Sequence, residues 1–200
     1  MQKLIILIIA ITCLCSCVSR KLADKSIDIS AGVPFSLLTP ASLGKQLALT
    51  QAAEISFDNN QHELLFQAEI TSKKMVVVGL LASGTRLFTI EFDGEKITSE
   101  GISKVIEKIK PGYLIADIQL SLWPDKILRE HLKQHSDCFK SGQCELLNSN
   151  EGNRRRFMKD GEEIISISYR GTPSYKHQLE FKHHLRGYGL KISPLAIEEF

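Results

Sequence analysis

The sequence predicts a mainly β, α+β domain in which short helices interrupt a series of antiparallel strands. Apolar and polar residues alternate with a period of two over much of the stretch from residue 46 to residue 192. Asp-Gly pairs at residues 93–94 and 160–161 are hairpin signals, because glycine tolerates the positive φ of such turns. Residues 115–134 instead show helical spacing. A chain of 200 residues has room for one domain with one hydrophobic core.

The first five strands are expected before the helices. Leu47, Leu49 and Ala53 share one face of the first strand, and polar residues share much of the other face. Residues 58–60, Asp-Asn-Asn, are expected to turn the chain. The third strand, from Met75 to Leu81, is a continuous apolar run with valine at three successive positions. The five strands are expected over residues 46–57, 64–70, 75–81, 88–92 and 95–100.

Two amphipathic helices are expected next, over residues 115–122 and 125–134. They are broken at Trp123-Pro124, because proline has no N–H and biases the residue before it away from helix. Alternation then resumes, so the helices lie between the fifth and sixth strands. The later strands are expected over residues 156–159, 165–169, 179–185 and 188–192.

The amino terminus has the pattern of an export signal. Lys3 precedes an uncharged, mostly apolar run from Leu4 to Cys15, which fits the ~7–15 residues of a signal-peptide core and is too short for a membrane span. Leu-Cys-Ser-Cys at residues 14–17 resembles a bacterial lipobox. Cleavage would then follow Ser16, and Cys17 would carry a diacylglyceryl group and an amine acylated by a chain such as palmitate. The alternatives are a plain secretory signal or a cytoplasmic N-terminal helix.

The lipobox implies a place in the cell and a division of the chain. Val18 stands where enteric-type sorting uses Asp to retain a lipoprotein in the inner membrane. The expected location is therefore the periplasmic face of the outer membrane, with Cys17 as the lipid anchor. We expect a signal peptide at residues 1–16, a lipidated tether at 17–32 and a β domain at 33–200.

Charge and motifs exclude several classes of function. The chain has 25 Lys and Arg against 23 Asp and Glu, a net charge of +2, which is too balanced for a protein that neutralises phosphates. Export also excludes nucleic acid as a partner. No P-loop, G-x-S-x-G or H-E-x-x-H motif is present, and no nucleophile–base pair is visible. We therefore expect no enzyme activity and no cofactor.

Two cysteines of the expected mature chain lie close together. Cys138 and Cys144 are separated by Phe-Lys-Ser-Gly-Gln, and an oxidising periplasm favours a disulfide between them. One alternative is a zinc site, because His131 and His135 share one helical face beside Cys138. A second alternative is a pair of free thiols.

The order of elements behind a lipobox resembles the outer-membrane lipoprotein receptor LolB and the periplasmic carrier LolA. The chain more closely resembles a family of lipoproteins of unknown function that recurs in bacterial aryl polyene pigment gene clusters. The Gly-Thr-Arg-Leu-Phe and Asp-Ile-Gln-Leu-Ser-Leu-Trp-Pro segments are the most specific matches. The matching stretches lie at residues 38–45, 76–80, 84–94, 116–124 and 167–169.

The resemblance implies a LolB-like half-open antiparallel β-barrel, with the helices as a lid over an apolar cavity that holds acyl chains. An ordinary collapsed core would use the same residue types. By the resemblance, Leu80 and Leu81 mark a membrane-insertion loop, with a buried hairpin end as the alternative. The candidate cavity residues are Leu64, Phe66, Val76, Val78, Phe88, Ile90, Phe92, Leu120, Leu122, Trp123, Ile167 and Phe181.

The function expected from these features is non-enzymatic. An outer-membrane lipoprotein would bind or transfer a hydrophobic acylated molecule, either an aryl polyene lipid or a lipoprotein. Lipoprotein-sorting or pigment-export proteins are the expected protein partners. The Arg154–Arg156 run would either attract anionic lipid headgroups or form a solvated strand edge. The alternatives are a scaffold that docks a membrane partner around a filled core, and an enzyme acting on acyl chains.

Overall fold

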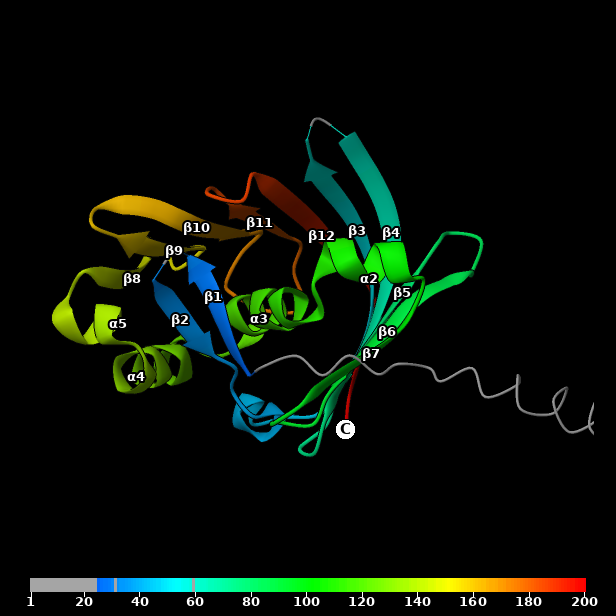
Figure 1. The fold of residues 1–200 in the computed structure, drawn as a ribbon, viewed down its shortest axis with the longest axis horizontal. Coiled ribbons are helices and arrows are strands. Elements are labelled where there is room, and N and C mark those ends of the chain that lie inside the picture. Colours follow the sequence, from blue (N-terminus) through cyan, green and yellow to red (C-terminus); the bar gives the residue numbers. More distant parts are fainter. Residues whose placement is uncertain (1–24, 31, 59) are drawn as a thin grey trace, which may run out of the picture.

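Ten strands form one antiparallel sheet that curves around helix α3 (Figure 1). The computed structural model describes residues 25–30, 32–58 and 60–200. The predicted signal peptide and Cys17 lie outside the described residues. The strand order is β7-β6-β5-β4-β3-β12-β11-β10-β9-β8. The mainly β class predicted from alternation is confirmed, but the sheet is not closed into a barrel, because β7 and β8 are two separate edges.

The first half of the sheet is a meander of five hairpin-connected strands, all of them predicted. Their inward side chains alternate with outward ones, as Leu47, Leu49 and Ala53 do on β3. Two sharp turns use positive φ, at Asp58 and Gly94. The strands are β3 (Leu47–Phe57), β4 (Asn60–Ile70), β5 (Met75–Leu80), β6 (Arg86–Phe92) and β7 (Ile97–Gly101).

The second half is another meander, and its last strand joins the two halves. Strand β12 pairs with β3 from Tyr188 opposite Phe57 to Glu199 opposite Leu47. It continues well past the predicted end at residue 192. Strand β8 was not predicted, because its five residues carry little alternation. The strands are β8 (Cys144–Asn148), β9 (Arg154–Lys159), β10 (Glu162–Tyr169), β11 (Leu179–His183) and β12 (Tyr188–Glu199).

Four helices connect the two halves, between the fifth strand of the first meander and the start of the second. They are α2 (Ser103–Ile109), α3 (Pro111–Leu122), α4 (Asp125–His135) and α5 (Asp137–Ser141). The predicted break at Trp123-Pro124 separates α3 from α4. Helix α3 begins at Pro111, a position where the missing N–H costs nothing. Among the described residues, no helix has the length and apolar character needed to cross a membrane.

A separate two-stranded hairpin packs on α3. It consists of β1 (Ser26–Ser30) and β2 (Val33–Ser36). Residues 26–30 fall within the predicted tether, so the folded part begins earlier than expected. Ile29 and Val33 are fully buried, and their small polar neighbours hid this short alternation in the sequence.

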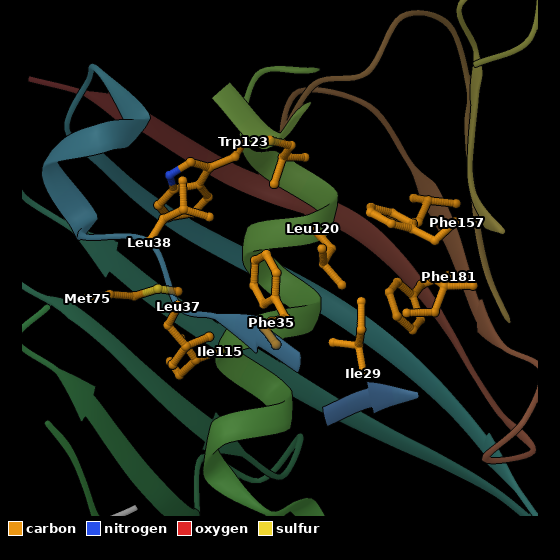
Figure 2. Packing of buried hydrophobic residues seen from close by; sticks show 14 of the residues in the cluster. Ile29, Phe35, Leu37, Leu38, Met75, Ile115, Leu120, Trp123, Phe157 and Phe181 are labelled. Atoms are coloured by element: carbon orange, nitrogen blue, oxygen red, sulfur yellow. The ribbon is translucent and has the colours of Figure 1, made fainter. Parts of the chain in front are cut away.

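The hydrophobic core lies on the concave side of the sheet, around α3 (Figure 2). Phe35 and Leu37 approach α3 from the N-terminal hairpin and the segment after it. Ile115 and Leu120 on α3 meet them there and have no exposed surface. Helix α3, the first of the two helices predicted as a lid, is therefore an internal element buried on several sides.

A disulfide joins Cys138 on α5 to Cys144 at the start of β8. The two cysteines that the zinc alternative would use as ligands are therefore bonded to each other. His131 instead places Nε2 2.5 Å from the carbonyl oxygen of Ser36. In the described ranges, no three His, Cys, Asp or Glu side chains gather as a metal site.

Removing this disulfide with the double substitution Cys138→Ala and Cys144→Ala is expected to lower the free energy of unfolding by about 2 kcal/mol. The cost is modest because the two cysteines are only six residues apart, and a short loop limits the unfolded chain little. Urea unfolding with and without dithiothreitol measures the effect. The reductant must shift the wild-type midpoint and leave the double variant unchanged; an equal shift in both would contradict the prediction.

Candidate functional site

An apolar pocket lies between α3 and the middle of the sheet. Its volume is about 50 Å³. Three polar residues, Gln51, Asp117 and Ser121, interrupt an otherwise apolar lining. The apolar lining residues come from β4, β5, α3, β11 and β12: Phe66, Ala68, Val77, Leu114, Ile118, Leu122, Leu179, Phe181, Leu190 and Ile192.

One face of α3 forms the helical wall of this pocket. Leu114, Asp117, Ile118, Ser121 and Leu122 lie at positions i, i+3, i+4, i+7 and i+8, which share one side of an α-helix. The opposite side is packed into the core. The pocket therefore depends on how firmly α3 is held from behind.

A buried glutamine holds the back of α3. Gln119 is fully buried, and its amide both accepts from the backbone N–H of Leu38, at 2.9 Å, and donates to the carbonyl oxygen of Leu38, at 2.7 Å. This pair mimics one rung of a β-ladder and gives both the nitrogen and the oxygen of the amide a hydrogen-bond partner. One turn further, the indole of Trp123 donates to Ser42 Oγ at 2.7 Å.

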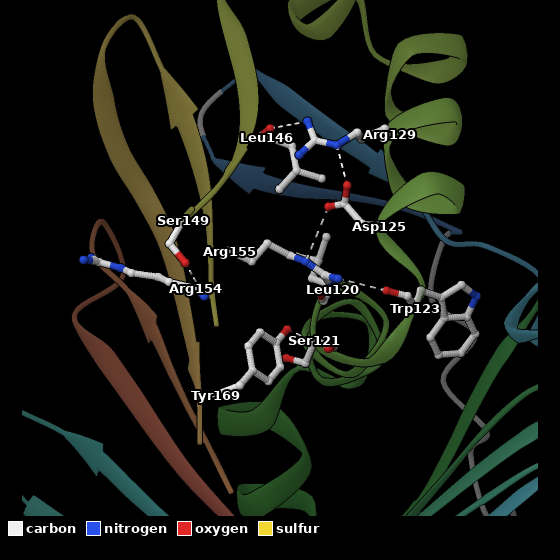
Figure 3. Close-up of polar contacts among 10 residues, drawn as sticks. All are labelled: Leu120, Ser121, Trp123, Asp125, Arg129, Leu146, Ser149, Arg154, Arg155 and Tyr169. Carbon is white, nitrogen blue, oxygen red and sulfur yellow. Dashed lines mark hydrogen bonds and ion pairs between the residues drawn. The ribbon is translucent and has the colours of Figure 1, made fainter. Parts of the chain in front are cut away.

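A second clamp holds the carboxyl end of α3 (Figure 3). Arg155 on β9 donates to the carbonyl oxygens of Leu120, at 2.5 Å, and Trp123, at 3.2 Å. Tyr169 on β10 donates to the carbonyl oxygen of Ser121 at 2.8 Å. These carbonyls carry the negative end of the helix dipole, so a guanidinium stabilises them strongly.

The arginine run therefore divides into different roles. Arg155 is only 2% exposed and belongs to the helix clamp, which neither prediction for this run included. Arg154 points to the other face of the strand and pairs with Glu163 at 2.8 Å. Successive residues on a strand face opposite sides of the sheet, which explains the division.

Asp117 is a carboxyl group within the apolar wall. It is 7% exposed, and Oδ2 accepts a hydrogen bond from the hydroxyl of Tyr188 at 2.6 Å. Burial raises its pKa to about 7, against smaller opposing effects of Tyr188 and Arg186. Burial and the neighbouring carboxyl also raise the pKa of Tyr188.

The pKa of His183 is shifted in the opposite direction from that of Asp117. It is buried, and its Nε2 lies 2.8 Å from the carbonyl oxygen of Ile29. Burial, helped by the charge of Arg186, lowers its pKa to about 4. His184, which follows it, points to the other face of the sheet, beside Ser166 and Lys182.

These pKa shifts set the pH dependence of stability. The folded state keeps a proton on Asp117 that the unfolded chain releases near pH 3.8, so this contribution to the free energy of unfolding falls as pH rises from about 4 to about 7. His183 contributes in the reverse sense, and its part is lost as pH falls from about 6.5 to about 4. The two effects oppose each other between these limits, and above pH 6.5 the Asp117 effect remains.

Only part of the predicted cavity set surrounds the pocket. Phe66, Leu122 and Phe181 line it. Leu64 is half-buried against the core, outside the lining. The rest of the inward-facing set is fully buried in the core: Phe88, Ile90, Phe92, Leu120, Trp123 and Ile167.

Val76 and Val78 lie on the opposite face of the sheet from the pocket. Their neighbour Val77 lines it instead, because it pairs with the inward Ala68 of β4. A run of three valines shows no alternation, so the register of the neighbouring strand was the signal that could have placed them.

The predicted insertion loop follows β5. Leu80 ends the strand and is half-buried, whereas Leu81 is 39% exposed. Gly84 has a φ of 83° and closes the turn with an N–H bond to the carbonyl of Leu81, at 2.8 Å. The structure thus places an apolar side chain at an exposed turn, which is the geometry the insertion hypothesis needs.

One serine–histidine pair that the sequence did not reveal lies on the convex face of the sheet. Ser166 Oγ is 2.9 Å from His184 Nε2, and Glu163 Oε1 is 3.1 Å from the same nitrogen. In a nucleophilic relay the acid must hold Nδ1 so that Nε2 is free to accept the hydroxyl proton. Because both partners share Nε2, this arrangement is not such a relay.

The fold places this chain among proteins with an open, curved antiparallel sheet that wraps around a central helix, with an apolar pocket between the two. Residues 48–196 match the family described as "Protein of unknown function (DUF3261)", and the chain belongs to that family. No curated protein matches the sequence significantly.

The chain is similar to several solved structures at low identity, of which two are given. One is a LolA superfamily protein from Nitrosomonas europaea, with a TM-score of 0.40 and 9% identity over 80% of this chain and 89% of that one. The other is a domain assigned to an outer membrane lipoprotein-sorting protein from Vibrio parahaemolyticus, with a TM-score of 0.38 and 8% identity over 78% and 85%. These likenesses are too distant to inform function.

Proposed function

We propose that this protein is a non-enzymatic binder that holds or passes on a hydrophobic acylated molecule in the pocket beside α3. The observation that carries the proposal is the pocket itself, which is lined by ten apolar side chains from five elements. Apolar pockets with a few convergent polar groups are the usual sites of small apolar ligands. The lipobox at Cys17 supports a place on the periplasmic face of the outer membrane.

The pocket has to widen before it takes up an acyl chain. Its volume of about 50 Å³ is far below the ~300–1,000 Å³ of pockets that enclose drug-sized ligands. Gln119, Trp123 and Arg155 hold α3 from behind, so widening requires β3, β4 and β12 to move away from the helix. Leu114, Ile118 and Leu190 are only half-buried at this contact, which keeps the cost of separation low.

The cargo expected from the resemblance is an aryl polyene lipid or the acyl chains of a lipoprotein. The apolar lining suits either, because both present long hydrocarbon to the protein. The small volume also favours a second candidate function, in which the core is filled and the protein docks a membrane partner.

Substitution in the pocket wall separates the two functions. Ala68→Leu adds a side chain to the pocket, whereas Ala48→Leu adds the same atoms on the outer face of the neighbouring strand. The purified full chain is photolabelled with a diazirine-bearing palmitamide, and the labelled peptides are mapped. We expect labelling of α3 and β4 in the wild type, a loss of about tenfold in Ala68→Leu, and no change in Ala48→Leu.

Two outcomes would overturn this proposal. Labelling no higher than that of the heat-unfolded chain would point to the docking scaffold. Equal labelling of the wild type and Ala68→Leu would mean that the acyl chain binds elsewhere.

A further inference from the structure

We propose that the pocket takes acyl groups that carry no negative charge, such as esters and amides, and that it holds the ligand while Asp117 keeps its proton. The inference rests on the proposed function and names the substrate class of the same pocket. It starts from one buried carboxyl group, that of Asp117, which takes no part in the contacts of Gln119 and Arg155 that hold α3 in place.

The position of Asp117 is the first argument. It lies between Leu114 and Ile118 on the lining face of α3, and it is the one charged residue in the segment from Pro111 to Leu122. Its hydrogen bond from Tyr188 crosses from α3 to β12. A ligand that fills the space beside this face would touch the carboxyl group directly.

The neighbouring charges are the second argument. Arg186, in the turn before β12, favours the ionised form of Asp117. Its guanidinium is already engaged, since it donates to the carbonyl oxygen of Asp28 and lies 3.5 Å from the ring centre of Tyr113. From β11, His183 is neutral above about pH 4. The hydroxyl group of Tyr188 also favours the ionised form of Asp117, but the cost of burying the charged carboxylate is larger than both effects.

The consequence for binding follows from desolvation. An acyl chain in the pocket would remove the remaining water from Asp117, and the charged form is the one that loses most. A bound fatty acid would bring its own carboxylate into the same low-dielectric space, where an ionised Asp117 would repel it and where it would lose its water even beside a protonated Asp117. An ester or amide of the same length brings no such charge.

The size of the effect follows from the pKa of about 7 in the free protein. If the protonated form alone binds, the competent fraction falls about tenfold from pH 6 to pH 8, and the affinity falls with it. The affinity for an uncharged ligand should therefore depend on pH although the ligand does not titrate.

The test compares decanamide with decanoate as competitors of the palmitamide photoprobe, at pH 6 and pH 8. In the wild type, decanamide should bind about tenfold more weakly at pH 8 than at pH 6. Decanoate should bind at least tenfold more weakly than decanamide at pH 8. The variant Asp117→Asn keeps an oxygen that accepts from Tyr188 and should lose the pH dependence of decanamide binding, whereas decanoate should stay weaker at both pH values because its own carboxylate must still be desolvated. The matched control is Asp137→Asn, whose side chain on α5 is fully exposed; it should behave as the wild type.

A second variant keeps the carboxyl group. The hydroxyl of Tyr188 lowers the pKa of Asp117, so Tyr188→Phe should move the pH midpoint of decanamide affinity upward. This variant decides the matter if Asp117→Asn does not fold.

The failures are distinguishable. A decanamide affinity that is the same at pH 6 and pH 8 in the wild type, as in Asp117→Asn, would overturn the role of Asp117 and leave the proposed function intact. A midpoint unmoved in Tyr188→Phe would also overturn it. Absence of any competition in every protein would instead overturn the proposed function.

Discussion

Replacing Arg155 with methionine is expected to lower the free energy of unfolding by about 3–5 kcal/mol. The guanidinium is buried and donates to the carbonyl oxygens of Leu120 and Trp123 at the end of α3. Charge-assisted hydrogen bonds of this kind contribute about 1.5–3 kcal/mol each, and methionine would leave both carbonyls buried without a donor. Asp125 would also lose a charge partner, at 3.9 Å.

Urea unfolding followed by circular dichroism measures this change, and Arg154→Met is the matched control. Arg154 is the adjacent residue on β9, but its side chain is 45% exposed and pairs with Glu163 on the outer face of the sheet. Exposed pairs contribute about 0–1 kcal/mol, so the control should lose little. Similar losses in the two variants would show that the clamp does not hold the helix.

Replacing Trp123 with alanine is the second large expected effect, a loss of about 3–5 kcal/mol. The indole has no exposed surface, and its N–H reaches Ser42. Alanine would leave a cavity in the core and a hydroxyl group without its donor.

The same measurement, with Trp123→Phe as the intermediate variant, separates packing from the hydrogen bond. Phenylalanine keeps most of the volume and should lose less than alanine. A loss below about 1 kcal/mol for Trp123→Ala would mean that the indole borders a hollow, as the sequence-based hypothesis had it, because a loosely packed side chain contributes little.

Most strands could be predicted because one face of the sheet is buried and the other faces solvent, so apolar and polar residues alternate along each strand. Strand β3 shows this clearly, since its inward and outward residues differ in polarity along most of its length. The same logic failed for β1 and β8, which have five residues each. A short strand gives too few alternations to distinguish it from a loop.

The site was harder to predict than the fold. Hydrophobic character places Phe66 and Trp123 equally well in a core or beside a pocket, and only the position of α3 decides between them. Asp117 carried a signal that could have been used, because a lone charge in an apolar helix needs an explanation. Arg155 carried none, since its two neighbours are also arginines and nothing marks the inward one.

The central position of β12 has a consequence for how the chain folds. Each meander consists of strands that pair with their sequence neighbours, and such local contacts form early. The two meanders meet only where Leu190 pairs with Ile55 and the flanking residues pair with theirs, across a separation of well over one hundred residues. Closing so long a loop is entropically slow, so we expect the β3–β12 pairing to limit the folding rate. Until the last strand arrives, both meanders present an open edge, and a chain stalled at that stage would be prone to aggregate through β3.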